Sequence, residues 1–212
     1  LGYTFFLKKS ELDYISKRLK KNSFYIYYPN KYCEKVIIYQ KIPDIILIEI
    51  EIKEEIKHQD ILGSLMNLGI DEGLFGDIII FNNHYYFYTF RYMFDYYRLE
   101  FNKIKHSYLH LLERDLHYLD NYEPIFTDTK IIIKSLRIDS VIAKIIHCNR
   151  EEVKKIIKDK KVIYNDEILK DFDKQLKIND TFSIRKIGKF VFSEIISNTK
   201  KDNLIIIVKK YG

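Results

Sequence analysis

Hydrophobic residues follow two different periods along the chain, and the changes between these periods predict where its elements lie. Residues 8–21 repeat apolar positions at helical spacing. Residues 23–28 and 36–39 are rich in aromatic and β-branched side chains and are separated by a Pro-Asn break, so they predict a strand and its partner. We expect these segments to form a small α/β unit over residues 1–44.

The next part of the chain predicts a strand, a helix and a hairpin in that order. Residues 45–52 alternate Ile and Leu with Glu, which is typical of a strand with one buried and one solvated face. Asp60 is a candidate N-cap for a helix that Gly69 ends. The Asn pair at residues 82–83 predicts the turn between two aromatic-rich strands.

A helix over residues 92–101 and a last strand over 130–134 would complete an RRM-like alternation of elements. A middle domain is therefore predicted over residues 45–134, and residues 120–129 read as the linker toward the C-terminus. An RRM binds RNA through aromatic residues of RNP-type sequences, and none is recognisable here. We expect this domain to bind RNA weakly or only to orient its neighbours.

Two short helices and a strand are predicted between residues 135 and 165. Ser135 is a candidate N-cap of the first helix. Asn149 is a candidate N-cap of the second helix, and Glu152 lies three residues later, at the spacing of a capping box. Residues 162–165 then read as a strand and a turn.

Three β-rich runs follow, over residues 181–185, 189–195 and 204–209. With the two preceding helices they predict a C-terminal domain over residues 135–212. The fold class expected for the whole chain is α+β.

Positive charge is concentrated in this C-terminal domain. The chain of 212 residues carries a formal net charge of +6, and residues 135–212 hold 18 Lys and Arg against 11 Asp and Glu. The first 134 residues hold 18 Lys and Arg against 19 Asp and Glu. A polyanion is the simplest partner for a surface that gathers the excess charge in this way.

The basic residues of the two helices recur at helical spacing. Arg137 and Lys144 are seven residues apart on one flank of the first helix. Arg150, Lys154 and Lys158 follow one another at i, i+4 and i+8 beside the apolar stripe of the second helix. An ordinary amphipathic helix pair with a solvated face is the alternative interpretation.

Sequence motifs in the same region resemble the S4-type RNA-binding domain. They are Ser-Leu-Arg-Ile-Asp at residues 135–139, Asn-Arg at 149–150 and Val-x-x-Asn at 162–165. Residues 149 and 160 depart from the pattern, since Asn and Lys stand where family members usually have Ser and Gly.

Other stretches resemble the YlmH-type family of S4-domain proteins. Residues 180–190 and Thr-Lys-Lys at 199–201 are similar to its C-terminal half. The order H-x-D-x-L-G, L-G-I and G-D-I between residues 58 and 78 is similar to its middle part, where we interpret it as a fold signature.

The resemblance implies a domain in which two helices on a small antiparallel sheet present a basic groove to structured RNA. It implies a non-catalytic protein that binds rRNA or tRNA, on the large ribosomal subunit, in translation or in the handling of stalled peptidyl-tRNA. The residues expected at the RNA are Arg137, Lys144, Asn149, Arg150, Lys154, Lys155, Lys158, Lys160, Lys161, Arg185, Lys186, Lys189, Lys200 and Lys201.

Two further hypotheses stay open. S4-type domains are often attached to catalytic domains, and Arg-Ile-Asp at residues 137–139 is similar to the Arg-Leu-Asp of pseudouridine synthases, but it lies in a helical pattern. The second hypothesis is therefore an RNA-modifying enzyme with an active site within residues 1–130. The third is a protein-interaction module whose basic face meets an acidic partner.

Metal and cofactor chemistry is not indicated by the sequence. His106, His110, Glu113 and His117 would share a face if residues 103–119 formed one helix, which is a zinc-like spacing. A structural role is the stronger interpretation, because the sequence places no Asp or Glu where it would orient the histidine rings as metal ligands. No glycine-rich phosphate loop and no zinc-deaminase motif occurs, so we expect no cofactor and no metal.

The remaining composition bears on the compartment. Cys33 and Cys148 are far apart and neither belongs to a Cys-x-x-Cys pair, which favours a reducing cytosol. No apolar run approaches the length of a membrane span, so we expect a soluble cytoplasmic protein without a membrane partner. Residues 1–7 are too short for a signal peptide and begin without Met, so we expect a trimmed or incomplete N-terminus.

Overall fold

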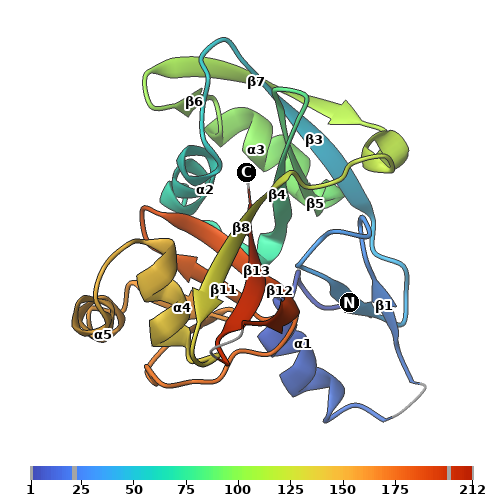
Figure 1. Ribbon diagram of the computed structural model, residues 1–212. Helices are drawn as coiled ribbons and strands as arrows, with labels where there is room; N and C mark the ends of the chain where they lie inside the picture. The colour runs from blue at the N-terminus through green and yellow to red at the C-terminus, as the bar shows by residue number, and fades with distance from the viewer. Residues whose placement is uncertain (1, 21–22, 200–201, 212) are drawn as a thin grey trace. The chain divides into compact units, whose positions relative to one another are not determined.

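A computed structural model of the chain describes residues 2–20, 23–199 and 202–211, which form an α+β structure. The chain divides into two compact units, an N-terminal unit, Leu1–Glu123, and a C-terminal unit, Pro124–Gly212. Figure 1 shows their elements. The division falls within the predicted linker, and residues 1–44 share one unit with the middle domain from which the sequence separated them.

The first elements of the N-terminal unit are one helix and a two-stranded sheet. Helix α1 (Lys9–Ser16) is shorter than the predicted helix over residues 8–21. None of its residues is fully buried, so packing does not extend it, and most helical stability in proteins comes from such packing. Strands β1 (Tyr25–Tyr27) and β2 (Ile37–Tyr39) pair antiparallel, which confirms the predicted pair.

A five-stranded antiparallel sheet with the order β4-β5-β3-β7-β6 forms the centre of the N-terminal unit. The order of elements is the predicted alternation of strand, helix, hairpin, helix and strand, with β7 as its last main strand. The bounds are β3 Ile45–Ile52, α2 His58–Asn67, β4 Phe75–Phe81, β5 His84–Phe90, α3 Phe94–Glu100, β6 Lys103–Ile104 and β7 Ser107–Arg114. Short 3-10 turns lie at Glu72–Leu74, Arg91–Met93 and Leu116–Leu119.

Both faces of this sheet are buried. Helices α2 and α3 cover one face through a core that includes Ile61 and Tyr97. On the other face Phe6, Ile37 and Leu119 pack against aromatic residues of β5. The prediction of one solvated face for residues 45–52 is therefore wrong over most of its length, since the first six residues of β3 are all buried.

Contacts with β4 hold the residues before β3 over the second face of the sheet. Asp77 accepts the backbone N–H groups of Glu34 and Lys35, and the Lys35 ammonium donates to the carbonyls of Glu72 and Phe75. A glycine is needed at position 76, next to Asp77, because a Cβ at this position would lie 2.8 Å from a ring carbon of Phe6.

The structure tests three local predictions, of which one is wrong and two are confirmed. Lys57 is the N-cap residue of α2, and Asp60 accepts the Lys57 backbone N–H from the third helical position, so Asp60 is not the N-cap. Gly69 ends the helix with a φ of +71°, as predicted. Asn82 and Asn83 have φ values of +51° and +61°, which confirms the hairpin turn.

Residues 103–119 form strands and a 3-10 turn and do not form a helix. The helical spacing that would bring His106, His110, Glu113 and His117 together is therefore absent. Within residues 2–20, 23–199 and 202–211, no group of three or more His, Cys, Asp or Glu side chains is arranged to hold a metal ion.

The C-terminal unit is a six-stranded antiparallel sheet with the order β10-β9-β11-β12-β13-β8, and two helices pack on it. The bounds are β8 Phe126–Ile133, α4 Ile138–Ile145, α5 Arg150–Lys158, β9 Val162–Tyr164, β10 Glu167–Ile168, β11 Thr181–Ile184, β12 Gly188–Asn198 and β13 Leu204–Tyr211. Strand β8 pairs along its whole length with β13. The strand predicted at 130–134 therefore belongs to this sheet and not to the middle domain.

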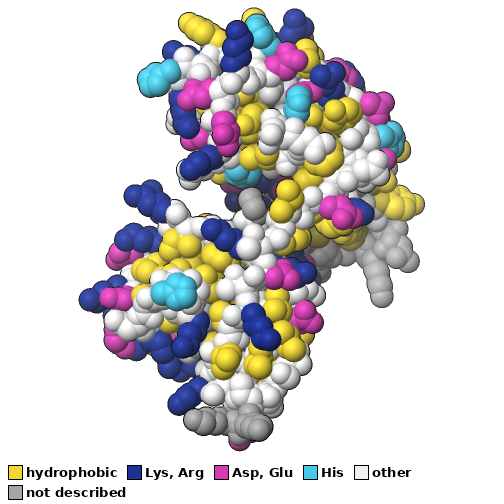
Figure 2. Space-filling view, turned by 45° about the horizontal axis from the view of Figure 1, so that its top comes forward, with side chains coloured by type: hydrophobic (Ala, Val, Ile, Leu, Met, Phe, Trp, Pro, Cys, Tyr) yellow, Lys and Arg dark blue, Asp and Glu magenta, His cyan; other side chains and the backbone are white. Residues whose placement is uncertain are grey.

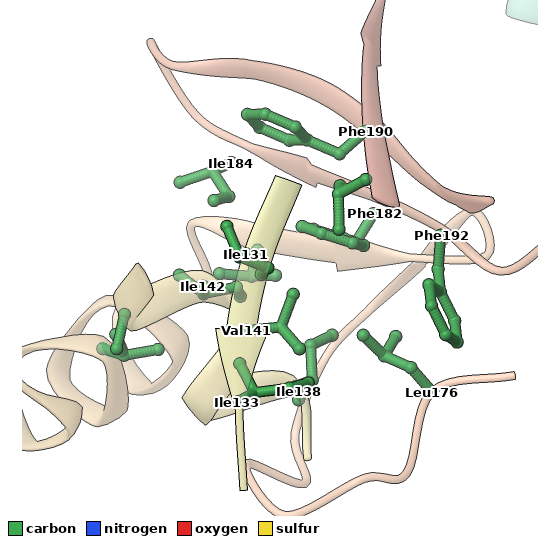
Figure 3. Packing of buried hydrophobic residues seen from close by; sticks show 14 of the residues in the cluster. Ile131, Ile133, Ile138, Val141, Ile142, Leu176, Phe182, Ile184, Phe190 and Phe192 are labelled. Carbon is green, nitrogen blue, oxygen red and sulfur yellow. The ribbon is translucent and has the colours of Figure 1, made fainter. Parts of the chain in front are cut away.

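The core of the C-terminal unit lies between α4 and the sheet. Figure 3 shows Val141 and Ile142 of α4 among side chains of the sheet, including Ile131 and Phe182. Phe182 stacks on Phe190 of the neighbouring strand, with 5.4 Å between the ring centroids. This core fixes the helices from which the basic side chains project.

In the described part of the chain, every helix is too short or too polar to cross a membrane.

We predict that Ile142→Ala lowers the free energy of unfolding of the full chain by about 2–5 kcal/mol, because it leaves a cavity beneath α4. Urea denaturation followed by circular dichroism measures this change. Ile168→Ala is the matched control, since this side chain is 49% exposed on an edge strand and its loss should change stability by less than about 0.5 kcal/mol. Equal losses in the two variants would contradict the assignment of Ile142 to the core.

Candidate nucleic-acid interface

The predicted capping box at the start of α5 is present. The Asn149 side-chain oxygen accepts the Glu152 backbone N–H at 2.9 Å, and the Glu152 carboxylate accepts the Asn149 N–H at 3.1 Å. Asn149, a predicted RNA contact, therefore has its carbonyl oxygen committed to the helix. Ser135 does not cap α4, whose N-cap residue is Arg137.

Helix α4 begins later than predicted because the residues before it are held extended. The Leu176 N–H donates to the Leu136 carbonyl, and the Ile138 N–H donates to the Lys174 carbonyl. Arg137 also forms an antiparallel bridge with Gln175. This pairing keeps residues 136–137 in a strand-like conformation up to the first turn of the helix.

A buried carboxylate joins the two helices. The Asp139 side chain has no exposed surface, and its Oδ2 lies 2.7 Å from Arg150 Nη2 and 3.1 Å from Arg137 Nη2. Burial by itself raises the pKa of the Asp139 carboxyl, but hydrogen bonds and charge from the two guanidinium groups outweigh it and hold this pKa below its usual value. Arg137 and Arg150 therefore stabilise the fold, besides any contact they make with a ligand.

A shallow hollow of about 730 Å³ lies beside this junction. Four basic side chains line it, namely Lys134, Lys144, His147 and Arg150. Ile132, Ala143 and Cys148 supply apolar wall, and Ser140 and Asn203 supply polar groups. The cations of its lining suit contact with the phosphate oxygens of a nucleic acid.

A second group of cations lies where α5 ends. The Arg185 N–H donates to the Lys161 carbonyl, so the turn between β11 and β12 lies beside the loop after α5. Lys160 and Lys186 in these two turns adopt positive φ values of +57° and +69°. The loop is therefore built with Lys160 in the left-handed conformation, where the family pattern has Gly.

Helix α5 connects the two groups. Arg150 stands at its first turn, and Lys155 and Lys158 are exposed along its outer side. Nine residues of helix span about 13 Å, which is close to the distance over which several phosphates follow one another. Figure 2 shows Lys and Arg side chains crowded over the edge of the C-terminal unit that carries α5.

We name this set of cations on α4, α5 and the two turns the α5 cationic surface. Its residues are Lys144, Arg150, Lys155, Lys158, Lys160, Lys161, Arg185 and Lys186.

Other predicted contacts are committed elsewhere or lie apart. Lys154 forms an ion pair with Glu151 at 2.7 Å, and its ammonium lies over the Phe172 ring. Lys189 lies over the Tyr211 ring in the sheet. Lys200 and Lys201 lie outside the described residues.

The sequence prediction missed several lining residues, among them Lys134, His147 and Asn203. Lys134 and Asn203 stand at the adjacent ends of β8 and β13, which are distant in sequence, and His147 follows α4 with a φ of +54°. No local signal identifies Lys134 and Asn203, because only strand pairing brings them beside α4.

The middle domain does not offer the surface that an RRM uses. RNA-binding RRM sheets expose aromatic residues on which bases stack. Here Tyr86, Tyr88 and Phe90 are buried beneath the N-terminal segment, and their face includes the buried carboxylate of Glu49, which pairs with Arg114.

One family model matches the middle part of the chain. Residues 44–118 match the family model described as "Putative RNA-binding domain in YlmH". The match confirms the resemblance to the YlmH-type family for the middle domain, and it supports RNA binding. It ends before β8, in agreement with the placement of that strand in the C-terminal unit.

A solved structure of the cell division protein ylmH from Streptococcus pneumoniae is similar to this chain. The sequences are 22% identical, and the TM-score is 0.46. The alignment covers 56% of this chain and 81% of that one. No curated protein matches the chain.

We predict that Arg150→Glu destabilises the protein, because it places a second carboxylate against buried Asp139 and removes one of its two cations. The free energy of unfolding should fall by roughly 2 kcal/mol or more. Lys155→Glu, at an exposed position of the same helix, should change it by less than about 0.5 kcal/mol. Urea denaturation of both variants measures the difference, and a fully stable Arg150→Glu variant would exclude the anchoring role.

Proposed function

We propose that the protein is a non-catalytic RNA-binding protein that holds structured rRNA or tRNA against the α5 cationic surface. The observation that carries this proposal is the run of exposed cations along α5 and the two turns beside its C-terminus. Lys144, Lys155, Lys158 and Lys160 form no ion pair with another described residue, so they remain available to phosphates.

The chemistry of this surface favours RNA shape as the feature recognised. The α5 cationic surface offers ammonium and guanidinium groups but few side chains that could read base edges. Duplex RNA hides its base edges in a deep, narrow groove and is bound chiefly through phosphates, 2′-hydroxyls and shape. A rigid, folded RNA, the kind of target expected for an S4-type domain, therefore fits this surface better than a single-stranded sequence does.

The burial of Asp139 supports a non-catalytic role over the pseudouridine-synthase alternative. A catalytic carboxylate must come within hydrogen-bond reach of the substrate. The Asp139 carboxylate is fully buried and already holds two guanidinium groups. The Arg-Ile-Asp motif thus serves as a structural junction in this proposal.

The acidic-protein alternative is less favoured by the local charge. Cations from α4, α5 and two separate turns lie along one side of the unit over a length that suits a phosphate backbone. We further propose the large ribosomal subunit in the cytoplasm as the place of binding, with stalled peptidyl-tRNA as a candidate state. This step rests on the S4-type and YlmH-type resemblance.

We predict that the full chain binds ribosomal RNA with an affinity that falls steeply with salt. The slope of log K against log salt should be about −0.7 to −0.9 for each phosphate neutralised. The double variant Lys155→Glu/Lys158→Glu should bind more weakly and lose about two units of that slope. Filter binding over a salt series measures both quantities.

The control for this experiment is Lys170→Glu/Lys174→Glu, which makes the same charge change in the loop before β11. It should keep most of the affinity of the unaltered protein. Equal losses in the two double variants would show diffuse attraction without a defined surface. A salt-insensitive affinity would contradict the proposed function itself.

We also predict that the protein cosediments with the large ribosomal subunit at low salt and is released at high salt. Gradient fractionation of a cell extract, probed for this protein, measures its distribution. The Lys155→Glu/Lys158→Glu variant should shift toward the top of the gradient, whereas Lys170→Glu/Lys174→Glu should not. If all three proteins stay at the top at low salt, the ribosomal assignment is wrong.

A further inference from the structure

The N-terminal unit carries its own concentration of positive charge. The unit holds 16 Lys and Arg against 18 Asp and Glu. Residues 8–21 alone hold six Lys and Arg against two Asp and Glu, so the rest of the unit holds 10 against 16. Six of the 16 cations of the unit thus lie in and around α1, and the remainder of the unit carries a net negative charge.

Helix α1 is partly buried and is anchored at its N-terminal end. Leu12 and Ile15 are partly buried, and Lys8, just before the helix, forms an ion pair with Glu72 at 2.9 Å. Glu11 accepts the Lys8 backbone N–H at 2.8 Å, so one of the two carboxylates of this segment serves as part of the helix cap. These contacts involve Lys8 and Glu11 and do not involve the lysines on the outer side of the segment.

The outer side of the segment presents cations together with an exposed ring. Lys9, Lys17 and Lys20 are exposed, and so is the ring of Tyr14, at 60%. The guanidinium carbon of Arg18 lies 3.5 Å from the centroid of that ring, and Arg18 Nη1 donates to the Tyr14 carbonyl at 2.9 Å.

This pair suits an unpaired nucleotide. A flat guanidinium held on a tyrosine ring is a pre-ordered stacking platform, and neighbouring lysines can neutralise the phosphates on either side. An acidic peptide would use the lysines but would gain little from the stacked pair. The geometry therefore favours a nucleic acid over an acidic protein.

We propose that α1 and the turn after it, residues 8–20, form a second RNA contact that takes a single-stranded nucleotide step beside a structured region. The contact uses residues of the N-terminal unit and none of the residues of the α5 cationic surface, and it gives the N-terminal unit an RNA-binding element other than its covered sheet. This inference rests on the proposed function, since it presumes that the full protein binds RNA.

Site-specific photocrosslinking tests the contact in the full chain. A benzoylphenylalanine is placed at Tyr14 or, as the matched control, at Tyr108, which is 76% exposed on β7 of the same unit and has Lys103 beside it. Total ribosomal RNA is the probe. Crosslinking to RNA should be several-fold stronger from position 14, and equal labelling at the two positions would overturn the proposal.

A charge-reversal pair supplies an independent measurement. Lys17→Glu/Arg18→Glu should weaken binding of ribosomal RNA and lower the salt slope by about two units. Lys53→Glu/Lys103→Glu, at exposed positions elsewhere in the unit, should leave both quantities unchanged. Unaltered binding by the Lys17→Glu/Arg18→Glu variant would remove α1 from the interface.

The outcomes distinguish this inference from the proposed function. If the unaltered protein fails to bind ribosomal RNA, the proposed function fails and the α1 contact fails with it. If the unaltered protein binds but position 14 does not crosslink to RNA, only the α1 contact is wrong. Crosslinking of position 14 in cell extract to an acidic protein, without RNA, would likewise overturn the α1 proposal.

Discussion

The buried carboxylate of Asp139 is the interaction on which the C-terminal unit depends. It lies at the first turn of α4 and accepts hydrogen bonds from Arg137 before that helix and from Arg150 at the start of α5. A carboxylate without solvent contact is tolerable only when cations and hydrogen bonds compensate its lost hydration. The two arginines meet this requirement, and in doing so they fix the angle at which α5 and its lysines leave the core.

The N-terminal unit also depends on buried polar groups that compensate one another. Its sheet is covered on both faces, and the segment that covers the second face is held by buried polar contacts of Lys35 and Asp77. Burial lowers the pKa of the Lys35 ammonium, although the nearby carboxylates of Glu72 and Asp77 oppose that effect. The resulting layer covers the aromatic side chains of β5 and keeps them from contact with RNA.

Positive charge alone does not mark a binding residue in this protein. Arg137, Arg150 and Lys154 lie in the predicted basic face, yet each has an acidic partner within the chain. Lys155 and Lys158 are the more informative positions, because they are exposed and lie between the hollow beside α4 and the turn at Arg185. Within the α5 cationic surface, Arg150 and Lys161 are paired with Asp139 and Asp159. The four remaining lysines of its helices and of the turn at residue 160 have no such partner among the described residues.

The sequence by itself determined the local elements, because their signals are local. Helical spacing, the Asn149–Glu152 capping box and the Asn82–Asn83 turn each depend on residues within a few positions of one another. It also determined that the cationic surface would lie in the C-terminal part, since net charge is additive along the chain. Tertiary structure alone decided which strands pair. Strand β8 pairs with β13, which lies more than seventy residues later, and no local pattern in the sequence records a pairing over that distance. It also decided that Lys134 and Asn203 line one hollow and that Asp139 engages two arginines, because burial and ion pairing depend on contacts between residues that no spacing in the sequence records.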